Sequence, residues 1–277
     1  MPKRHIVCLT FDHDNTSLFI ANNRITPTML SRGDFGSVAL PRILDLLARF
    51  DAGATFFTPG HTLESYLQDA ELLLASGHEI GHHGWTHRVP ASLGRDGEEA
   101  ELVRGIETIK RLTGAAPVGY RSPAWDLSAH SVELMLKHGL KYDSSLMGHD
   151  YDCYYAPMPA EIPLERPIVP GMPTGLVEMP ISWSLDDFPY FEFMAGKNGI
   201  MPGLSAASAV LENFTEDFMY MKDNLDWGIL TYTFHPFVIG RGHRMRMLER
   251  LMQKLADEGA EFLSMQDALA AWLARQG

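Results

Sequence analysis

Four histidines lie within ten residues of this chain, and their spacing is typical of a metal site. They are His78, His82, His83 and His87. Imidazole nitrogen is an ordinary ligand for Zn²⁺ and similar divalent ions. Because His83 and His87 are four residues apart, a helical turn or a short loop can bring both nitrogens to about 2.0 to 2.1 Å from one ion. A catalytic ion needs at least one further protein ligand.

An Asp-His-Asp run near the amino terminus supplies two carboxylates. Asp12 and Asp14 directly follow the strand-like segment 6–11. Because they are two residues apart, their side chains can point to the same side, so that one binds a metal while the other stays free. Alone, the run is also typical of a solvated turn or a helix cap; combined with the histidine pair, it favours a metal site. Supporting hydrogen bonds or core positions are expected for three other histidines, His13, His78 and His82.

Three further polar positions stand where predicted strands end. Arg121 is either a surface residue before a turn or the partner that keeps a carboxylate base ionised and oriented. His235, which Pro236 follows, is well placed to protonate a leaving amine. Asp187, in the run 183–188, either raises the pKa of such a histidine or caps a turn.

Short apolar runs alternate with helical patterns along the chain, which predicts a parallel βα architecture. We expect strands over 6–11, 54–58, 79–81, 118–121, 141–144, 177–181 and 229–233. Amphipathic helices are expected over 38–50, 64–76, 98–112, 129–138, 206–224 and 245–258. Seven strands suit an irregular barrel, and the carboxyl ends of barrel strands share the face that holds the active site. The Pro-rich segment 156–180 is predicted to form a long excursion or a weakly bonded hairpin.

Composition narrows the classes of partner. The net charge of −12 over 277 residues argues against a nucleic-acid phosphate track and against an anionic membrane surface. A neutral or weakly polar substrate fits better. Cys8 and Cys153 are too few for a disulfide framework, and we expect reduced thiols. Without a signal-peptide pattern or a long apolar run, the expected location is the cytoplasm. No composition shift divides the chain, so one domain is expected over 1–277.

Four motifs, in this order, resemble the polysaccharide deacetylase superfamily, also called the NodB-homology domain. They are Leu9-Thr10-Phe11-Asp12, the run 77–87, Arg121-Ser122-Pro123 and Phe234-His235-Pro236. The resemblance implies an α/β fold, a distorted seven-stranded (β/α) barrel, with an Asp-His-His metal site, a separate aspartate base and a histidine acid. Carried across, His83 and His87 match the histidine ligands, Asp12 the base, Arg121 its tethering arginine and His235 the acid.

Two departures from the family pattern point to one branch. The usual adjacent aspartates are separated here by His13, which leaves Asp14 as the nearest metal ligand. The third motif continues with Ala124 and Trp125 instead of an aromatic residue and glycine. Both departures resemble the branch that contains Helicobacter-type peptidoglycan deacetylases, cyclic imide hydrolases and metal-independent allantoinases, whose members are commonly homotetramers.

The resemblance therefore predicts a metal-dependent hydrolase of non-peptide carbon–nitrogen bonds, with Zn²⁺ as the expected ion. An N-acetyl sugar or a related amide is the first expected substrate, and a small cyclic imide or allantoin-type ring is the alternative. A non-catalytic carbohydrate-binding barrel is a third reading. The residues expected to contact substrate are Ala124, Trp125, Trp183 and Asp187.

Overall fold

The central strand of the fold is β1 (Arg4–Asp12), which is buried along nearly its whole length in the computed structural model. Its near-continuous apolar run is typical of a strand covered on both faces of a parallel sheet. β1 pairs in parallel with β10 (Trp227–Phe234) and with β2 (Ala54–Thr58). The structure describes residues 3–196, 199–201 and 203–276.

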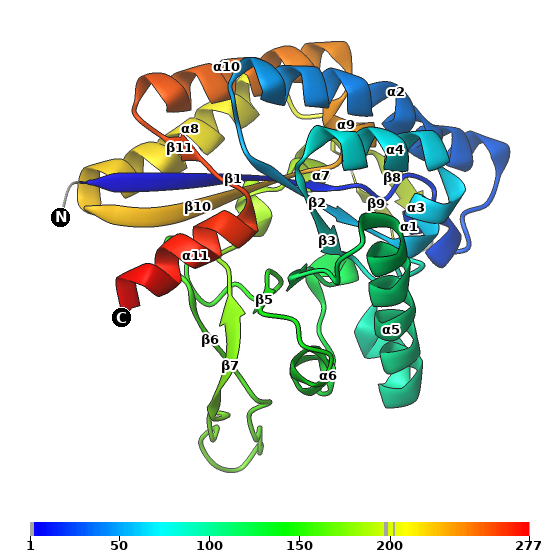
Figure 1. The fold of residues 1–277 in the computed structure, drawn as a ribbon, viewed down its shortest axis with the longest axis vertical. Coiled ribbons are helices and arrows are strands. Elements are labelled where there is room, and N and C mark those ends of the chain that lie inside the picture. Colours follow the sequence, from blue (N-terminus) through cyan, green and yellow to red (C-terminus); the bar gives the residue numbers. More distant parts are fainter. Residues whose placement is uncertain (1–2, 197–198, 202, 277) are drawn as a thin grey trace.

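The strands form one curved sheet in the order β10-β1-β2-β3-β4-β5-β7-β6, with β11 also paired to β1 (Figure 1). The remaining strands of this sheet are β3 (Glu79–His82), β4 (Gly119–Tyr120), β5 (Tyr142–Asp143), β6 (Tyr154–Pro157), β7 (Pro173–Glu178) and β11 (Glu261–Phe262). The path from β10 to β7 contains seven parallel strands, and β6 is antiparallel to β7. A separate pair consists of β8 (Met194–Gly196) and β9 (Gly199–Met201).

The prediction of a distorted seven-stranded barrel is confirmed, and the distortion has a clear location. Among the described residues, β7 and β10 share no ladder. Asp186 forms an isolated bridge to Thr233, and the Ile229 N–H of β10 donates to the Tyr151 carbonyl ahead of β6. The curled sheet is thus an incomplete ring whose seam lies beside the end of β10.

Helices cover the outside of the sheet, with α2, α8 and α10 along one side of β1 (Figure 1). The longer ones are α2 (Pro27–Arg49), α4 (Leu67–Ser76), α5 (Gly94–Thr113), α8 (Ala207–Asn224), α10 (Gly242–Asp257) and α11 (Met265–Gln276). The shorter ones are α1 (Ser17–Ala21), α3 (Gly60–Ser65), α6 (Ser131–Lys137), α7 (Asp187–Phe191) and α9 (Pro236–Ile239), with single turns η1 (Pro90–Ser92), η2 (Pro123–Trp125) and η3 (Trp183–Leu185).

The expected elements are present, but several boundaries were wrong. The helix expected over 38–50 begins eleven residues earlier, because Thr26 caps α2 by accepting the Met29 N–H and Pro27 fits its first turn. The helix expected over 64–76 is broken at Tyr66 into α3 and α4. The carboxyl-terminal α11 was not expected at all.

The Pro-rich segment forms a β6–β7 hairpin that extends away from the barrel (Figure 1). Its ladder is irregular, since the register shifts between Tyr155 and Pro157. Large apolar side chains near its tip face solvent, with Ile162, Leu164 and Met172 exposed by 75%, 93% and 76%.

Two further expectations from the sequence concern the cysteine thiols and membrane-spanning helices. Cys8 and Cys153 are free thiols and both are buried. Among the described residues, the structure contains no helix with the length and apolar character needed to cross a membrane.

Candidate active site

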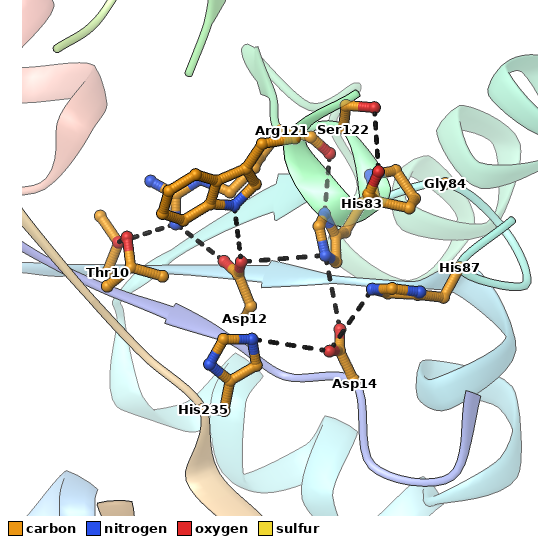
Figure 2. A network of polar contacts seen from close by, with 12 residues as sticks. Thr10, Asp12, Asp14, His83, Gly84, His87, Arg121, Ser122 and His235 are labelled. Carbon is orange, nitrogen blue, oxygen red and sulfur yellow. Dashed lines mark hydrogen bonds and ion pairs between the residues drawn. The ribbon is translucent and has the colours of Figure 1, made fainter. Parts of the chain in front are cut away.

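The polar residues expected at strand ends lie together at the carboxyl edge of the sheet (Figure 2). Asp12 ends β1 and Asp14 follows it, while His83 and His87 lie in the loop after β3. Arg121 follows β4, and His235 follows β10. All six side chains are buried. The parallel topology therefore brings residues more than two hundred positions apart into one site.

Asp14, His83 and His87 form a group whose potential ligand atoms lie within 4.8 Å of one another. His83 Nε2 is 3.4 Å from Asp14 Oδ1, and His87 Nε2 is 3.5 Å from Asp14 Oδ2. Two ligands about 2.1 Å from one tetrahedral ion are roughly 3.4 Å apart, so these spacings suit a shared ion. Neither carboxylate oxygen of Asp14, nor His83 Nε2, has a hydrogen-bond partner. Buried polar atoms seldom stay unpaired, and a cation between them would satisfy all three.

The tautomer of His83 supports the same interpretation. Its Nδ1 lies 2.7 Å from the carbonyl oxygen of Arg121, which can only accept a hydrogen bond, so Nδ1 carries the proton. Nε2 then presents a lone pair to the Asp14 carboxylate. Burial lowers the pKa of His83 to about 4, so the ring is neutral at pH 7. A lone pair facing a carboxylate is repulsive unless a cation lies between them, and orienting a ligand histidine through its other nitrogen is common at metal sites.

His82 supports the loop instead of facing the group. Its Nε2 donates to the Leu102 carbonyl at 2.9 Å, and its Nδ1 accepts the Gly84 N–H at 3.1 Å. Burial lowers the pKa of His82 to about 4, which suits a neutral ring with one donor and one acceptor. Gly84 and His87 both have positive φ, of 72° and 58°, and this tight turn directs the His87 ring back toward Asp14. His78 lies outside the site, half-buried against Phe56.

Asp12 and Arg121 form a fully buried ion pair. Arg121 Nη1 donates to Asp12 Oδ1 at 2.7 Å and to Thr10 Oγ1 at 2.8 Å. The guanidinium also donates to Ser144 and lies 4.2 Å from the centre of the Phe57 ring. Burial alone would raise the pKa of Asp12, but the charge and hydrogen bond of Arg121, together with the charges of His83 and His235, outweigh it and the pKa is lowered. Asp12 is thus held as a carboxylate, and its Oδ2 faces Trp125 Nε1 at 3.4 Å and His83 Nε2 at 3.9 Å.

His235 is held by two carboxylates on the opposite side of Asp14. Its Nδ1 lies 2.9 Å from Asp187 Oδ1 and 3.5 Å from Asp186 Oδ1, while its backbone N–H also donates to Asp187. Burial lowers the pKa of His235, but Asp186 and Asp187 reverse this effect and raise it to about 10. The ring is therefore protonated at neutral pH, and its Nε2 lies 3.9 Å from Asp14 Oδ2.

A cavity of about 340 Å³ opens above these groups. Its walls are mostly apolar and come from Leu18, Ala124, Trp125, Trp183, Phe188 and Pro189. The indole rings of Trp125 and Trp183 are stacked, with centroids 4.0 Å apart. Ala124 and Trp125 adopt left-handed φ values of 56° and 53°, and this unusual turn aims the Trp125 indole at Asp12.

The structure places three of the four expected substrate contacts, Ala124, Trp125 and Trp183, in the cavity wall, but not Asp187. Asp187 lies behind His235 and holds its Nδ1, whereas the neighbouring Asp186 lines the cavity. Sequence reasoning named only one of this adjacent pair. The two adjacent aspartates are visible in the sequence. Which of them lies behind His235 depends on the turn into α7, where Asp186 caps the helix by accepting the Phe188 N–H.

A curled parallel sheet that presents an ionised carboxylate, a protonated imidazole and a pair of neighbouring imidazoles at one edge holds groups suited to hydrolysis. The sequence profile described as polysaccharide deacetylase matches residues 2–142. The peptidoglycan deacetylase of Helicobacter pylori is 33% identical, over 90% of this chain and 89% of that protein. A peptidoglycan deacetylase-like protein of Gibberella zeae is 25% identical over 98% of this chain and 87% of its own length. The chain belongs to the polysaccharide deacetylase family.

Solved structures agree with this assignment. A protein from Mycobacterium smegmatis assigned to the polysaccharide deacetylases superposes with a TM-score of 0.84 and 28% identity, covering 100% of this chain and 92% of that one. Puue allantoinase shares the fold with a TM-score of 0.74 and 19% identity, over 98% of this chain and 90% of its own. The family membership confirms the expectation of a hydrolase that acts on carbon–nitrogen bonds other than peptide bonds.

Proposed function

We propose that the chain is a metal-dependent deacetylase of an N-acetyl sugar or a related compact amide. The observation that carries the proposal is the convergence of Asp14, His83 and His87 on one point between the Asp12–Arg121 pair and His235. Asp14, His83 and His87 would hold the ion, and zinc suits a carboxylate with two imidazoles. The similarity to a peptidoglycan deacetylase supports the N-acetyl sugar as substrate.

Each group in the site has a role in amide hydrolysis. A divalent ion in this position supplies Lewis acidity toward the substrate carbonyl and lowers the pKa of water toward about 7. Asp12, kept ionised by Arg121, accepts the proton of the attacking water at Oδ2, because its Oδ1 is already bonded to the guanidinium. His235 donates the proton on Nε2 to the departing nitrogen, since its Nδ1 is held by Asp187.

A small cyclic amide or imide is the second candidate, and the cavity itself favours it. A volume of about 340 Å³ is near the lower end for ligand sites, which typically span about 300–1,000 Å³. The stacked indoles of Trp125 and Trp183 form one wall, and a flat, weakly polar ring would pack well against the apolar lining. An extended polysaccharide would need room beyond this wall for its neighbouring sugars.

Metal removal combined with a substrate panel tests both readings. The protein stripped by a chelator should lose turnover and regain it with Zn²⁺, and the Asp14→Ala variant should not regain it. N-acetylglucosamine oligomers and succinimide-type rings, assayed side by side, distinguish the deacetylase from the imide hydrolase. Full turnover in the stripped protein would contradict the metal-dependent mechanism.

A homo-oligomer, with a tetramer as the expected state, forms part of the same proposal. The tip of the β6–β7 hairpin supports it, because three large apolar side chains, Ile162, Leu164 and Met172, are more than 70% exposed there. Large apolar side chains exposed on one element are a feature of many interaction sites.

A further inference from the structure

Asp69, in the first turn of α4, touches both neighbours of the proposed metal ligand Asp14. The side chain is buried, with 4% exposure for the residue. Its Oδ2 accepts a hydrogen bond from Asn15 Nδ2 at 3.0 Å, and His13 Nε2 lies 3.5 Å from the same oxygen. Ser37 Oγ, from α2, donates to that oxygen at 2.7 Å. One carboxylate oxygen of Asp69 therefore contacts the residues on either side of Asp14.

The backbone at Asn15 has a left-handed φ of 46°. Asparagine adopts this conformation more readily than most residues, because its short polar side chain can form local hydrogen bonds. Two glycines of α2 leave room for it. A Cβ on Gly33 would lie 2.5 Å from the Asn15 carbonyl oxygen, and a Cβ on Gly36 would lie 1.9 Å from Asn15 Oδ1. Asn15 is thus seated between α2 and α4, which leaves its side chain directed at Asp69.

This arrangement gives the residues on either side of Asp14 a common contact. Asp12 and Asp14 must both face the site while His13 and Asn15 turn away from it. Both of the outward side chains meet Asp69. The Asp14 carbonyl is held separately, by Thr62 Oγ1 at 2.7 Å. Hydrogen bonds therefore hold the Asp14 carbonyl and the Asn15 side chain, and His13 Nε2 lies at ion-pair distance from Asp69, while the Asp14 carboxylate stays free of hydrogen bonds.

We propose that Asp69 is a positioning residue for the metal site: by holding His13 and Asn15, it fixes the direction in which Asp14 presents its carboxylate. This inference rests on the proposed role of Asp14 as a metal ligand. Asp69 touches neither the ion nor the substrate.

Metal affinity, measured apart from catalysis, tests the inference. The full chain is stripped of metal and titrated with Zn²⁺ against a chromophoric chelator, and its Co²⁺ absorption spectrum is recorded as a signature of ligand geometry. We expect Asp69→Ala to weaken Zn²⁺ affinity about tenfold or more, as loss of outer support does at other metal sites, and to alter the Co²⁺ spectrum. Asp69→Asn keeps an acceptor oxygen and should retain both properties.

A second variant approaches the same contact from α2. Gly36→Ala improves the intrinsic helix propensity, yet its new methyl group displaces the Asn15 amide. It should therefore weaken Zn²⁺ affinity while α2 stays folded. Gly97→Ala, in α5, is the matched control, because its Cβ meets only Leu93 at an ordinary 3.5 Å, and it should leave the affinity unchanged.

The outcomes separate this inference from the proposed function. Unchanged affinity and spectrum in both Asp69→Ala and Gly36→Ala would overturn the role of Asp69, and so would equal losses in Asp69→Asn or in Gly97→Ala. If Asp14→Ala also binds Zn²⁺ as tightly as the unchanged protein, the proposed metal site itself is wrong. If Asp14→Ala loses the metal while Asp69→Ala and Gly36→Ala bind it as tightly as the unchanged protein, the metal site stands and the positioning role fails.

Discussion

Replacing Glu178 with glutamine should make the protein less sensitive to alkaline pH. Glu178 on β7 and Asp143 on β5 are opposite each other in adjacent parallel strands, and both are fully buried. Burial raises the pKa of Glu178 well above its usual value and that of Asp143 to about 6. The charge of Asp143 raises the pKa of Glu178 further, whereas a hydrogen bond from Glu178 lowers that of Asp143. The pair therefore retains a proton at pH 7 that the unfolded chain releases.

The sign and size of the effect follow from this proton. Both folded-state pKa values are raised, so the stabilisation is fully present below about pH 4 and is lost as the pH rises. Above about pH 6, where Asp143 is ionised, the proton on Glu178 remains. One extra proton in the folded state lowers the free energy of unfolding by about 1.4 kcal/mol per pH unit. The unchanged protein should lose stability at this rate over the pH range in which Glu178 keeps its proton.

Glutamine removes that proton and keeps the contacts. Glu178 Oε1 accepts the N–H groups of Ser145 and Leu146, each at 2.8 Å, and an amide oxygen can do the same. The amide nitrogen can donate to Asp143, whose Oδ2 has no other partner. The free energy of unfolding of Glu178→Gln, relative to that of the unchanged protein, should thus rise by about 1.4 kcal/mol for each pH unit above pH 6.

Urea denaturation at pH 5, 6, 7 and 8 measures this difference. Glu165→Gln, an exposed change in the β6–β7 hairpin with the same loss of charge, is the control and should give a difference that is independent of pH. If the difference for Glu178→Gln also stays constant across these pH values, the two carboxyls do not retain a proton in the folded state and the reasoning is refuted.

Three other variants examine the site and the hairpin. Asp187→Asn removes an anionic partner of His235 and should lower its pKa from about 10; because the protonated form is the acid, the alkaline limb of the kcat profile should move to lower pH, and an unmoved limb would argue against His235 as the acid. Trp183→Ala removes one stacked wall of the cavity and should raise KM for a small amide about tenfold, the equivalent of about 1.4 kcal/mol, with kcat little changed; a fall in kcat alone would contradict a binding role. Leu164→Asp places a charge on the exposed hairpin tip and should lower the oligomeric mass found by light scattering, whereas an unchanged mass would exclude the hairpin from the interface.

Much of the barrel could be predicted because its signals are local. The apolar runs over 6–11 and 54–58 closely match β1 and β2, since central parallel strands are apolar throughout. β4 and β5 are only two residues long in the structure, and a sequence pattern cannot define such short pairings. α11 was missed because its apolar pattern is weak, although Met265, Leu269 and Trp272 are buried against the sheet.

The site residues could be named from sequence motifs, but the contacts between their side chains could not be predicted. Asp14 was identified as the residue nearest to the usual position of the second aspartate in the first motif, and the structure places it within 3.5 Å of both rings. The opposite placements of Asp186 and Asp187 depend on a helix cap and on a bridge to Thr233, which involve residues distant in sequence. The contacts of Asp69 with His13 and Asn15 likewise join positions more than fifty residues apart.

The seam between β7 and β10 gives the two sides of the site different mechanical and evolutionary freedom. Asp12, Asp14, His83, His87 and Arg121 follow strands that are hydrogen-bonded on both edges. Asp186, Asp187 and the wall residues Trp183, Phe188 and Pro189 come from the segment that spans the seam, where one bridge replaces a ladder. The wall residues of that segment can therefore change without altering the pairing of the strands that carry Asp12, Asp14 and the histidine pair. Diversification of substrate shape should concentrate at Trp183, Phe188 and Pro189, while the two aspartates that hold His235 stay constant, so libraries aimed at new amides belong at these three positions.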